Sequence, residues 1–388
     1  MNEFTLNALS KDDPSWVKEK REKAFKEFQA LEMPSFKYGI GIVIDVKELN
    51  LTHLHPEEPQ DELVIVNPGA EILSFNNAIK KYPECFKSYF QIPQNKLEAL
   101  HESFWNAGIF IKIPENTKLE PILLNLTQTS TTRIDNCFIL AEKGSSSIII
   151  DVTRAIAKEM FRSYKVNILV EENAQCEYRS LQEFGKHAYD FTQKQAYVQR
   201  NGFMHWTEVV IGSKFTQTST KTFLQGKGSS SKSWGIFFGD AKQCYDINAQ
   251  TIHVASRSTS DMATKIVLNH EARAVYRGLV KINPKAINCE GYQKDDTILL
   301  SEFAKADAVP NLEIANNEVK CSHGATISQI DEEKLFYMKS RGLNEETAKH
   351  AIIEGFFEPI LKKMGNEKLQ KEIQVNIAKR LGVSHETS

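Results

Sequence analysis

Cys321 and His323 stand two positions apart and are of residue types that metal or sulfur chemistry uses. Their alternation with Val319 predicts an extended segment, in which residues i and i+2 point to the same face, about 6.6 Å apart. A thiolate and an imidazole both suit iron, but a metal cluster normally takes about four ligands. We therefore expect any metal here to take its other ligands from a partner chain or from sulfide and thiol donors, at an interface.

The same pair also has a purely structural interpretation. In this reading, Val319 and Cys321 share the inward face of a strand, and His323 is a hydrogen-bonded capping residue where the strand gives way to a helix. Isolated cysteines are usually small buried residues, so spacing alone leaves both interpretations open.

Other motifs that carry chemistry are incomplete. The six cysteines form no Cys-x-x-Cys pair of the kind that binds zinc or exchanges disulfides; they stand at 85, 137, 176, 244, 289 and 321. The glycine-rich stretch 225–231 lacks the spacing of a phosphate-binding loop, so we expect a turn there and no ATP bound by this chain. His270 and Glu271 begin like a zinc-protease helix, but Ala274 stands where the second histidine belongs.

Composition indicates an ordinary globular protein, with 41% hydrophobic and 25% charged residues among 388. The 48 lysines and arginines nearly balance the 50 aspartates and glutamates, which gives no electrostatic reason to expect a nucleic acid or membrane partner. Residues 1–6 do not begin a signal peptide, and no later stretch approaches the ~18 apolar residues of a membrane span. The sequence therefore predicts a cytoplasmic location.

Residues 1–107 are predicted to form a helical and mixed N-terminal region. Asp13 and Pro14 are placed to cap and begin a helix, whose apolar residues recur at helical spacing. These are Val17, Ala24, Phe28 and Leu31. A second helix is predicted over residues 95–104.

Residues 108–330 are predicted to form a repeating β core. Turn-forming pairs recur through this region, and the second members of these pairs are spaced 27 to 29 residues apart. They are Asn116, Gly144, Asn173, Asn201, Gly228, Arg257 and Pro284. β-branched runs lie between them, and each interval has room for several short strands and corners. The period indicates a repeating β architecture but leaves sandwich, propeller and parallel β-helix open.

Residues 331–388 are predicted to form a C-terminal module of three helices. The first covers 331–341, and Asn344 caps the second. The apolar residues of the second helix are Ala348, Ile352, Ile353, Phe356, Phe357, Ile360 and Leu361. The third helix has an apolar residue at every fourth position from Leu369 to Leu381. Such a module can cap a β repeat or dock a partner.

Four stretches carry a resemblance to a known family. They are residues 320–337, Tyr276-Arg277-Gly278-Leu279-Val280-Lys281, Pro310-Asn311-Leu312-Glu313-Ile314 and Ser340-Arg341-Gly342-Leu343. They resemble the SufB/SufD family, the scaffold subunits of a machine that assembles iron–sulfur clusters, and the similarity extends from about Leu97 onward. The resemblance implies a mainly β fold, a right-handed parallel β-helix with helical segments at both ends.

The resemblance also implies partners and a site. SufB and SufD pair with each other, and each binds the ATPase SufC through its C-terminal module. We expect the broad apolar face of the second helix to serve that docking, through Ile352, Ile353, Phe356, Phe357 and Ile360. The segment with Cys321 and His323 lies at the scaffold interface in the family, where a transient iron–sulfur cluster forms. We expect pairing by edge strands between Tyr276 and Ile314.

One position favours SufD over SufB. SufB proteins typically have glutamate directly after this histidine, whereas this chain has Gly324. Cys321 and Asn311 also resemble the residues of SufD proteins at these positions, although the sequence around Arg277 is at least as similar to SufB. The sequence leaves two possible partners, a SufB-type chain and a second copy of this chain. It also leaves open whether the complex uses a reduced flavin.

Two other classes of function stay open. Parallel β-helices also host carbohydrate-active enzymes with carboxylates along a groove, and Asp240, Asp246, Asp261 and Glu290 are candidates for that role. Alternatively, the chain is a structural interaction protein without metal chemistry. The lack of catalytic motifs favours a non-enzymatic scaffold.

Overall fold

The computed structural model of the protein describes residues 1–38, 42–46, 49–51, 54–56, 61–66, 69–86, 93–155 and 159–383. Within residues 35–38 and 42–45 the description covers the backbone alone. All statements below concern these residues.

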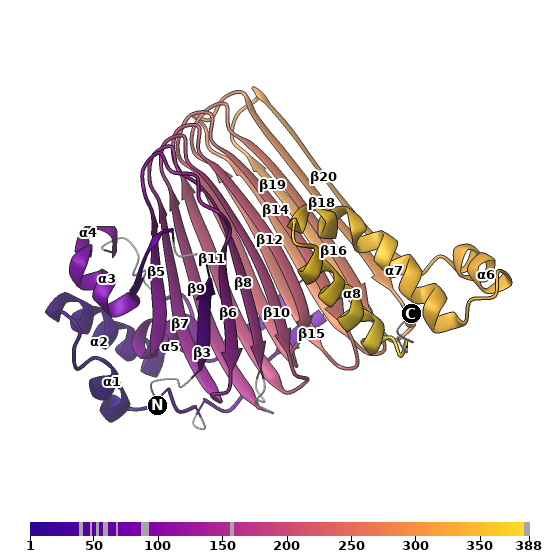
Figure 1. Ribbon diagram of the computed structural model, residues 1–388, viewed down its shortest axis with the longest axis horizontal. Helices are drawn as coiled ribbons and strands as arrows, with labels where there is room; N and C mark the ends of the chain where they lie inside the picture. The colour runs from indigo at the N-terminus through magenta and orange to yellow at the C-terminus, as the bar shows by residue number, and fades with distance from the viewer. Residues whose placement is uncertain are drawn as a thin grey trace.

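The core is a parallel β-helix in which the chain winds between two nine-stranded sheets (Figure 1). The even sheet contains β6 (Ile122–Gln128), β8 (Ser146–Ala155), β10 (Gln175–Phe184), β12 (Phe203–Gly212), β14 (Ser230–Gly239), β16 (Thr259–Leu268), β18 (Cys289–Leu299) and β20 (Val319–Gln329). The odd sheet contains β5 (Ala107–Ile113), β7 (Thr132–Ala141), β9 (Met160–Val170), β11 (Ala188–Val198), β13 (Phe215–Leu224), β15 (Cys244–His253), β17 (Arg273–Ile282) and β19 (Lys305–Ile314). At the N-terminal end, β3 (Glu62–Val66) and β4 (Glu71–Ser74) pair antiparallel with β6 and β5. The predicted parallel β-helix is therefore confirmed over sandwich and propeller.

The sequence period corresponds to one turn of the β-helix. Six of the seven predicted turn markers have the left-handed backbone conformation that a tight corner requires, with φ between 53° and 73°. Pro284 does not, because its ring fixes φ near −65°; Asn288 takes that conformation in the same turn, with φ 56°. Successive corners stack, and Asn201 donates a side-chain hydrogen bond to Asn173 at 3.2 Å.

The strands are longer than the β-branched runs of the sequence indicate. Most turns contain two strands of 10 or 11 residues, one in each sheet. The apolar pattern underestimates their length because polar residues continue the strands inside the core. In β11, for example, Asp190, Thr192 and Lys194 are all buried.

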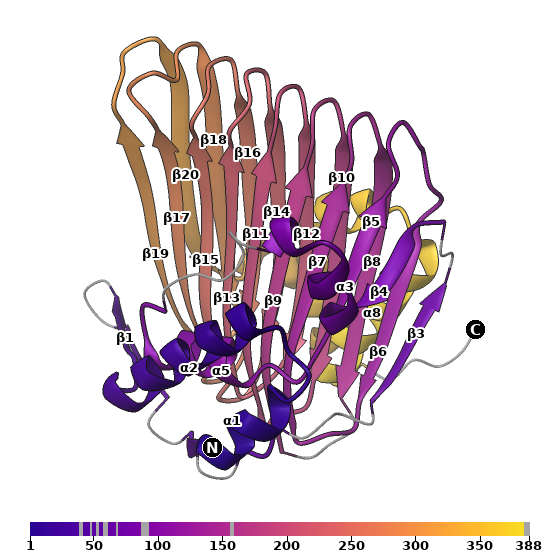
Figure 2. The ribbon, with the colours of Figure 1, turned by 90° about the vertical axis from the view of Figure 1, so that its left-hand side faces the viewer.

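The N-terminal helices cover the outer face of the odd sheet (Figure 2). They are α1 (Glu3–Leu9), α2 (Ser15–Ala30), α3 (Phe75–Lys81), α4 (Pro83–Phe86) and α5 (Lys96–Phe104). Phe28 of α2 and Phe104 of α5 belong to one apolar cluster with Phe161 and Phe191 of the sheet. A two-stranded hairpin of β1 (Ser35–Tyr38) and β2 (Ile42–Asp45) lies beside β19.

The helix predictions near the N-terminus are confirmed apart from one cap. Asn95 caps α5 as expected of a helix over 95–104. At α2, however, Pro14 occupies the cap position, and Asp13 instead accepts a hydrogen bond from Arg21 at 2.7 Å in a buried ion pair. An aspartate beside a helix start is a good cap. Here its carboxylate pairs with the buried guanidinium of Arg21 instead, because a buried charge without a partner destabilises the fold more than a missing cap does.

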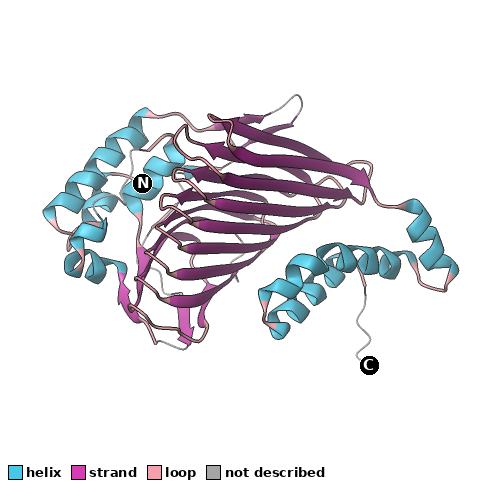
Figure 3. Ribbon diagram, turned by 90° about the horizontal axis from the view of Figure 1, so that it is seen from above, coloured by secondary structure: helices cyan, strands magenta, loops and turns pink. Residues whose placement is uncertain are grey.

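The C-terminal helices lie along the side of the β-helix (Figure 3). They are α6 (Glu332–Ser340), α7 (Glu345–Leu361), a short 3-10 helix (Lys362–Met364) and α8 (Glu367–Arg380). Asp331 and Asn344 cap α6 and α7. Because α7 and α8 pack on the outer face of the even sheet, they do not cap the end of the repeat. α6 projects away from the core and has no buried residue.

None of the helices in the described ranges is long and apolar enough to cross a membrane.

Candidate functional site at the open end of the β-helix

The β-helix ends in two edge strands, β19 and β20, which we call the open end. β19 pairs only with β17 and β20 only with β18, and no other described strand continues either sheet. Most residues of β20 are exposed, whereas alternate residues of β18 are buried. Two backbone edges are thus left side by side at one end of the molecule.

Cys321 and His323 both lie on β20, so the predicted extended segment is confirmed. Cys321 is in register with Gly291 and His323 with Gln293, and both partners are buried inward-facing residues of β18. The two side chains therefore belong to the inward row of the last turn. His323 is exposed in the middle of this strand, which runs on to Gln329, so its expected place at a strand end is wrong.

Gly291 lies beside the Cys321 sulfur at a position with no room for a side chain. A Cβ atom there would lie 2.7 Å from Cγ1 of Val280, 3.3 Å from Sγ of Cys321 and 3.5 Å from Oγ of Ser260. Cys321 is half-buried, and this burial raises the pKa of its thiol. In the single chain the sulfur is therefore held mainly as a thiol at neutral pH, and a metal or a positive neighbour is required to favour the thiolate.

The pair is not a complete metal site by itself. Among the residues that the structure describes, no three His, Cys, Asp or Glu side chains gather closely enough to hold a metal ion. This agrees with a site completed by groups from outside the chain.

The layer beneath His323 contains polar residues that the sequence analysis missed. Tyr276, Gln293 and Asp295 are buried in the penultimate turn, and their side-chain polar atoms have no hydrogen-bond partner among the described residues. Burial, followed by the charge of Asp296, raises the pKa of Asp295 to about 7. For Gln293 and Asp295, the sequence shows only that polar residues occupy alternate positions of β18. The fold is needed to show that these alternate residues face inward.

The helix face expected to dock an ATPase is largely used by the chain itself. Ile353, Phe357 and Ile360 are buried against the even sheet, so they must be removed from the docking set. Ile352 and Phe356 are half-buried at the edge of the same cluster. The sequence pattern showed an apolar face of α7 but not which surface covers it.

Three exposed apolar side chains lie on α6 and the following turn. Phe336 is 75% exposed, Tyr337 is 58% exposed, and Leu343 is also exposed. Single exposed apolar residues are common on protein surfaces, but three on one projecting element form a candidate interaction surface.

The carboxylates considered for a carbohydrate-active enzyme do not share a groove. Asp240 contacts His270 at a corner, and Asp246 is held on the odd sheet by Arg277 at 2.7 Å. Asp261 and Glu290 belong to the even sheet. The four carboxylates are thus divided between a corner and the two sheets, and of the four only Asp261 and Glu290 lie on neighbouring strands.

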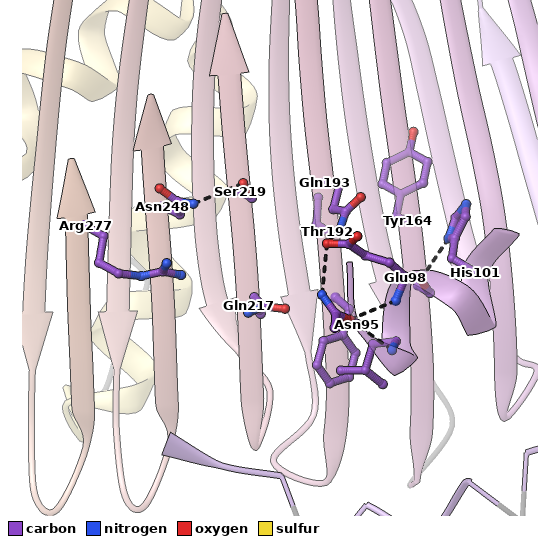
Figure 4. A pocket seen from close by; sticks show the side chains of 13 residues that line it. Asn95, Glu98, His101, Tyr164, Thr192, Gln193, Gln217, Ser219, Asn248 and Arg277 are labelled. Atoms are coloured by element: carbon purple, nitrogen blue, oxygen red, sulfur yellow. Dashed lines mark hydrogen bonds between the residues drawn. The ribbon is translucent and has the colours of Figure 1, made fainter. Parts of the chain in front are cut away.

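A small polar pocket of about 190 Å³ lies between α5 and the odd sheet (Figure 4). Glu98 points toward Gln193 and Asn95 and accepts hydrogen bonds from both. His101 is enclosed between Ser163 and Asn136, and burial lowers its pKa. These groups satisfy one another, as expected of a structural contact.

Comparison with known proteins defines the class to which this fold and open end belong. A family model described as "SUF system FeS cluster assembly, SufBD core domain" matches residues 124–356. The chain belongs to this SufBD family. Similar relatives are the iron-sulfur cluster assembly SufBD family proteins of Staphylococcus saprophyticus (29% identical), Staphylococcus haemolyticus (28%) and Staphylococcus aureus strain MRSA252 (29%). Each match spans 357 residues, which is 89% of this chain and 76% of the relative.

Proposed function

We propose that the chain is a non-enzymatic scaffold subunit of the SUF machine in the cytoplasm, on whose open end a nascent iron–sulfur cluster forms. The single observation that carries this proposal is the position of Cys321 and His323 in the inward row of an unpaired edge strand. Two ligand types face one accessible end, and a second scaffold chain can supply the rest. The cluster is cargo and not a resident cofactor.

The proposed partner at the open end is a SufB-type chain or a second copy of this chain. β17, which contains Tyr276, is paired on both sides, so the pairing surface is narrower than the expected segment from Tyr276 to Ile314. Unpaired backbone groups of β19 and β20 remain, and strand addition satisfies such groups. Because β2 lies beside β19, β20 is the more open of the two edges.

The SufD-like assignment rests on residue 324. A Cβ atom at Gly324 meets no other atom within 4 Å, so this position has room for the glutamate that is typical of SufB. Packing therefore does not explain why this chain has glycine and not glutamate at position 324. We assign the chain the role of the SufD-type partner.

A SufC-type ATPase is proposed to dock on α6. Phe336, Tyr337 and Leu343 replace the buried residues of α7 in this role. An ATPase held on a projecting helix can transmit its movement to the scaffold without disrupting the core.

The test compares three substitutions on β20 in cells that depend on this chain. His323→Ala is expected to leave folding and partner binding intact but to reduce the maturation of iron–sulfur enzymes. Cys321→Ser is expected to reduce it less, because sulfide or a partner thiolate can replace this sulfur, and to lower stability by about 1 kcal/mol. Ser322→Ala, on the opposite face of the strand, is the control. Normal enzyme maturation by a folded, assembled His323→Ala variant would remove the histidine from the site and favour a purely structural interaction protein.

A further inference from the structure

The interior of the β-helix contains a column of buried polar side chains. In its N-terminal turns the charged side chains of the column are paired. Arg133 contacts Asp61 at 2.8 Å and Asp135 at 2.7 Å, and the Tyr164 hydroxyl donates to Asp151 at 2.7 Å. Buried charges are normally paired in this way, because an unpaired one loses its hydration without compensation.

The penultimate turn departs from this rule. The Tyr276 hydroxyl, both amide atoms of Gln293 and both carboxyl oxygens of Asp295 have no hydrogen-bond partner in the described part of the chain. Asp295 is only 1% exposed, and the other two are equally buried. Thr264 and Thr297 lie near enough to lower the pKa values of Tyr276 and Asp295, but neither completes a hydrogen bond of good geometry.

The three side chains face one another across the interior. Two contacts align β17 with β18: a Cβ atom at Gly291 would lie 2.7 Å from Cγ1 of Val280, and Gln293 lies against Gly278. In this alignment the next inward residues of the two strands are Tyr276 and Asp295, which therefore face each other. Gln293 lies over Gly278, where a Cβ atom would approach its Nε2 to 1.9 Å. The absence of a side chain at Gly278 makes room for this amide.

Only the last turn separates these groups from the open end. Ala308 is in register with Tyr276, Ala325 with Asp295, and His323 with Gln293. Neighbouring strands are about 4.8 Å apart, so the residues of the last turn in register with the tyrosine and the aspartate are both small. The imidazole of His323 is placed beside the amide, on the same inward side.

We propose that Asp295, Gln293 and Tyr276 form, together with His323, a binding site for a divalent metal ion at the open end. Carboxylate, amide oxygen and imidazole are donors suited to Fe²⁺ and Mn²⁺, and a cation offsets the desolvation of the buried carboxylate. Water or a second scaffold chain supplies the remaining positions. The choice of iron as the physiological ion rests on the proposed scaffold function, whereas the site itself does not.

The test is a titration of the purified full-length chain with Mn²⁺, followed by electron paramagnetic resonance, and with Fe²⁺ under anaerobic conditions by calorimetry. One ion per chain is expected. Asp295→Asn is expected to weaken binding at least tenfold, and His323→Ala to weaken it as well. Asp296→Asn is the matched control, because this neighbouring carboxylate is paired with Lys294 at 2.9 Å. Circular dichroism checks that each variant is folded; Gln293→Leu provides a second probe if Asp295→Asn is not.

Two results would overturn the proposal. One is the absence of stoichiometric Mn²⁺ or Fe²⁺ binding by the wild-type chain, or equal binding by Asp295→Asn. The other is that Asp295→Asn leaves metal uptake unchanged but weakens pairing with a second scaffold chain, which would assign the carboxylate to a lysine or arginine of that chain. Neither result decides the scaffold function, which is tested separately by enzyme maturation in cells.

Discussion

At the residue scale, His253 shows how the interior accommodates polar groups. Its two ring nitrogens lie 2.8 Å from Oγ of Ser258 and 2.9 Å from Oγ of Ser260. A neutral imidazole offers one donor and one acceptor, and two hydroxyls satisfy both. Burial lowers the pKa of His253 to about 4, from 6.5.

This depressed pKa predicts a dependence of stability on pH. Between pH 6.5 and pH 4 the unfolded chain binds a proton at His253 that the folded chain does not. Its contribution to stability is therefore complete above pH 6.5 and is lost as the pH falls toward 4, by up to ~3 kcal/mol. Denaturant unfolding at pH 7.5 and pH 5 is expected to show a smaller difference for His253→Gln than for the wild type. An equal difference in both proteins would assign the acid sensitivity to other groups.

At the element scale, α6 and α7 differ in exposure although both carry phenylalanines: Phe336 is 75% exposed and Phe357 is buried. Phe336→Ala on α6 is expected to weaken capture of the ATPase in a pull-down and to leave unfolding unchanged, because the side chain is exposed. Phe357→Ala on α7 is expected to destabilise the chain by about 3–5 kcal/mol, because it opens a cavity against the even sheet. Phe4→Ala on α1, where the side chain is 82% exposed, is the control for loss of a surface aromatic. Wild-type ATPase capture by Phe336→Ala would argue against docking on α6.

At the scale of the whole molecule, the C-terminal helices and the β-helix form one body. α7 and α8 cover an apolar strip of the even sheet that includes Leu181, Val209, Trp234, Ile236 and Phe238. Ending the chain at residue 330 is therefore expected to expose this strip and to produce aggregation or loss of cooperative unfolding. Size-exclusion chromatography and binding of a hydrophobic dye would measure both. A soluble, cooperatively folded truncated chain would show that the helices are a separable module.

Pairing through the open end is also a property of the whole molecule. Ile327 lies in the inward row of β20 and is 42% exposed, and Val64 is 41% exposed on β3 at the other end of the β-helix. Ile327→Glu is expected to weaken pairing with a second scaffold chain at least tenfold in analytical ultracentrifugation, because it places a charge in the proposed interface. Val64→Glu is expected to leave pairing unchanged. The reverse result would move the interface to the N-terminal end.

Features that depend on local chemistry could be predicted from the sequence alone. The spacing of turn residues predicted one turn of the repeat, because a left-handed corner selects Asn and Gly at fixed intervals. Asn344 was correctly predicted to cap a helix because a cap is a local hydrogen bond, and the helices predicted to start at Asn95 and Asp331 are capped by these residues. The alternation of Val319, Cys321 and His323 likewise predicted a strand.

Which faces of the helices and strands meet could not be predicted from the sequence, because this depends on the tertiary structure. The apolar pattern of α7 does not say whether a partner or the even sheet covers Phe357, since both bury it equally well. Nor does the sequence show that the side chain of Asp295 faces inward and has no hydrogen-bond partner among the described residues, because both depend on strands that are distant in sequence. Burial and pairing are set by contacts between turns of the β-helix, and these contacts exist only once the chain has wound into two sheets.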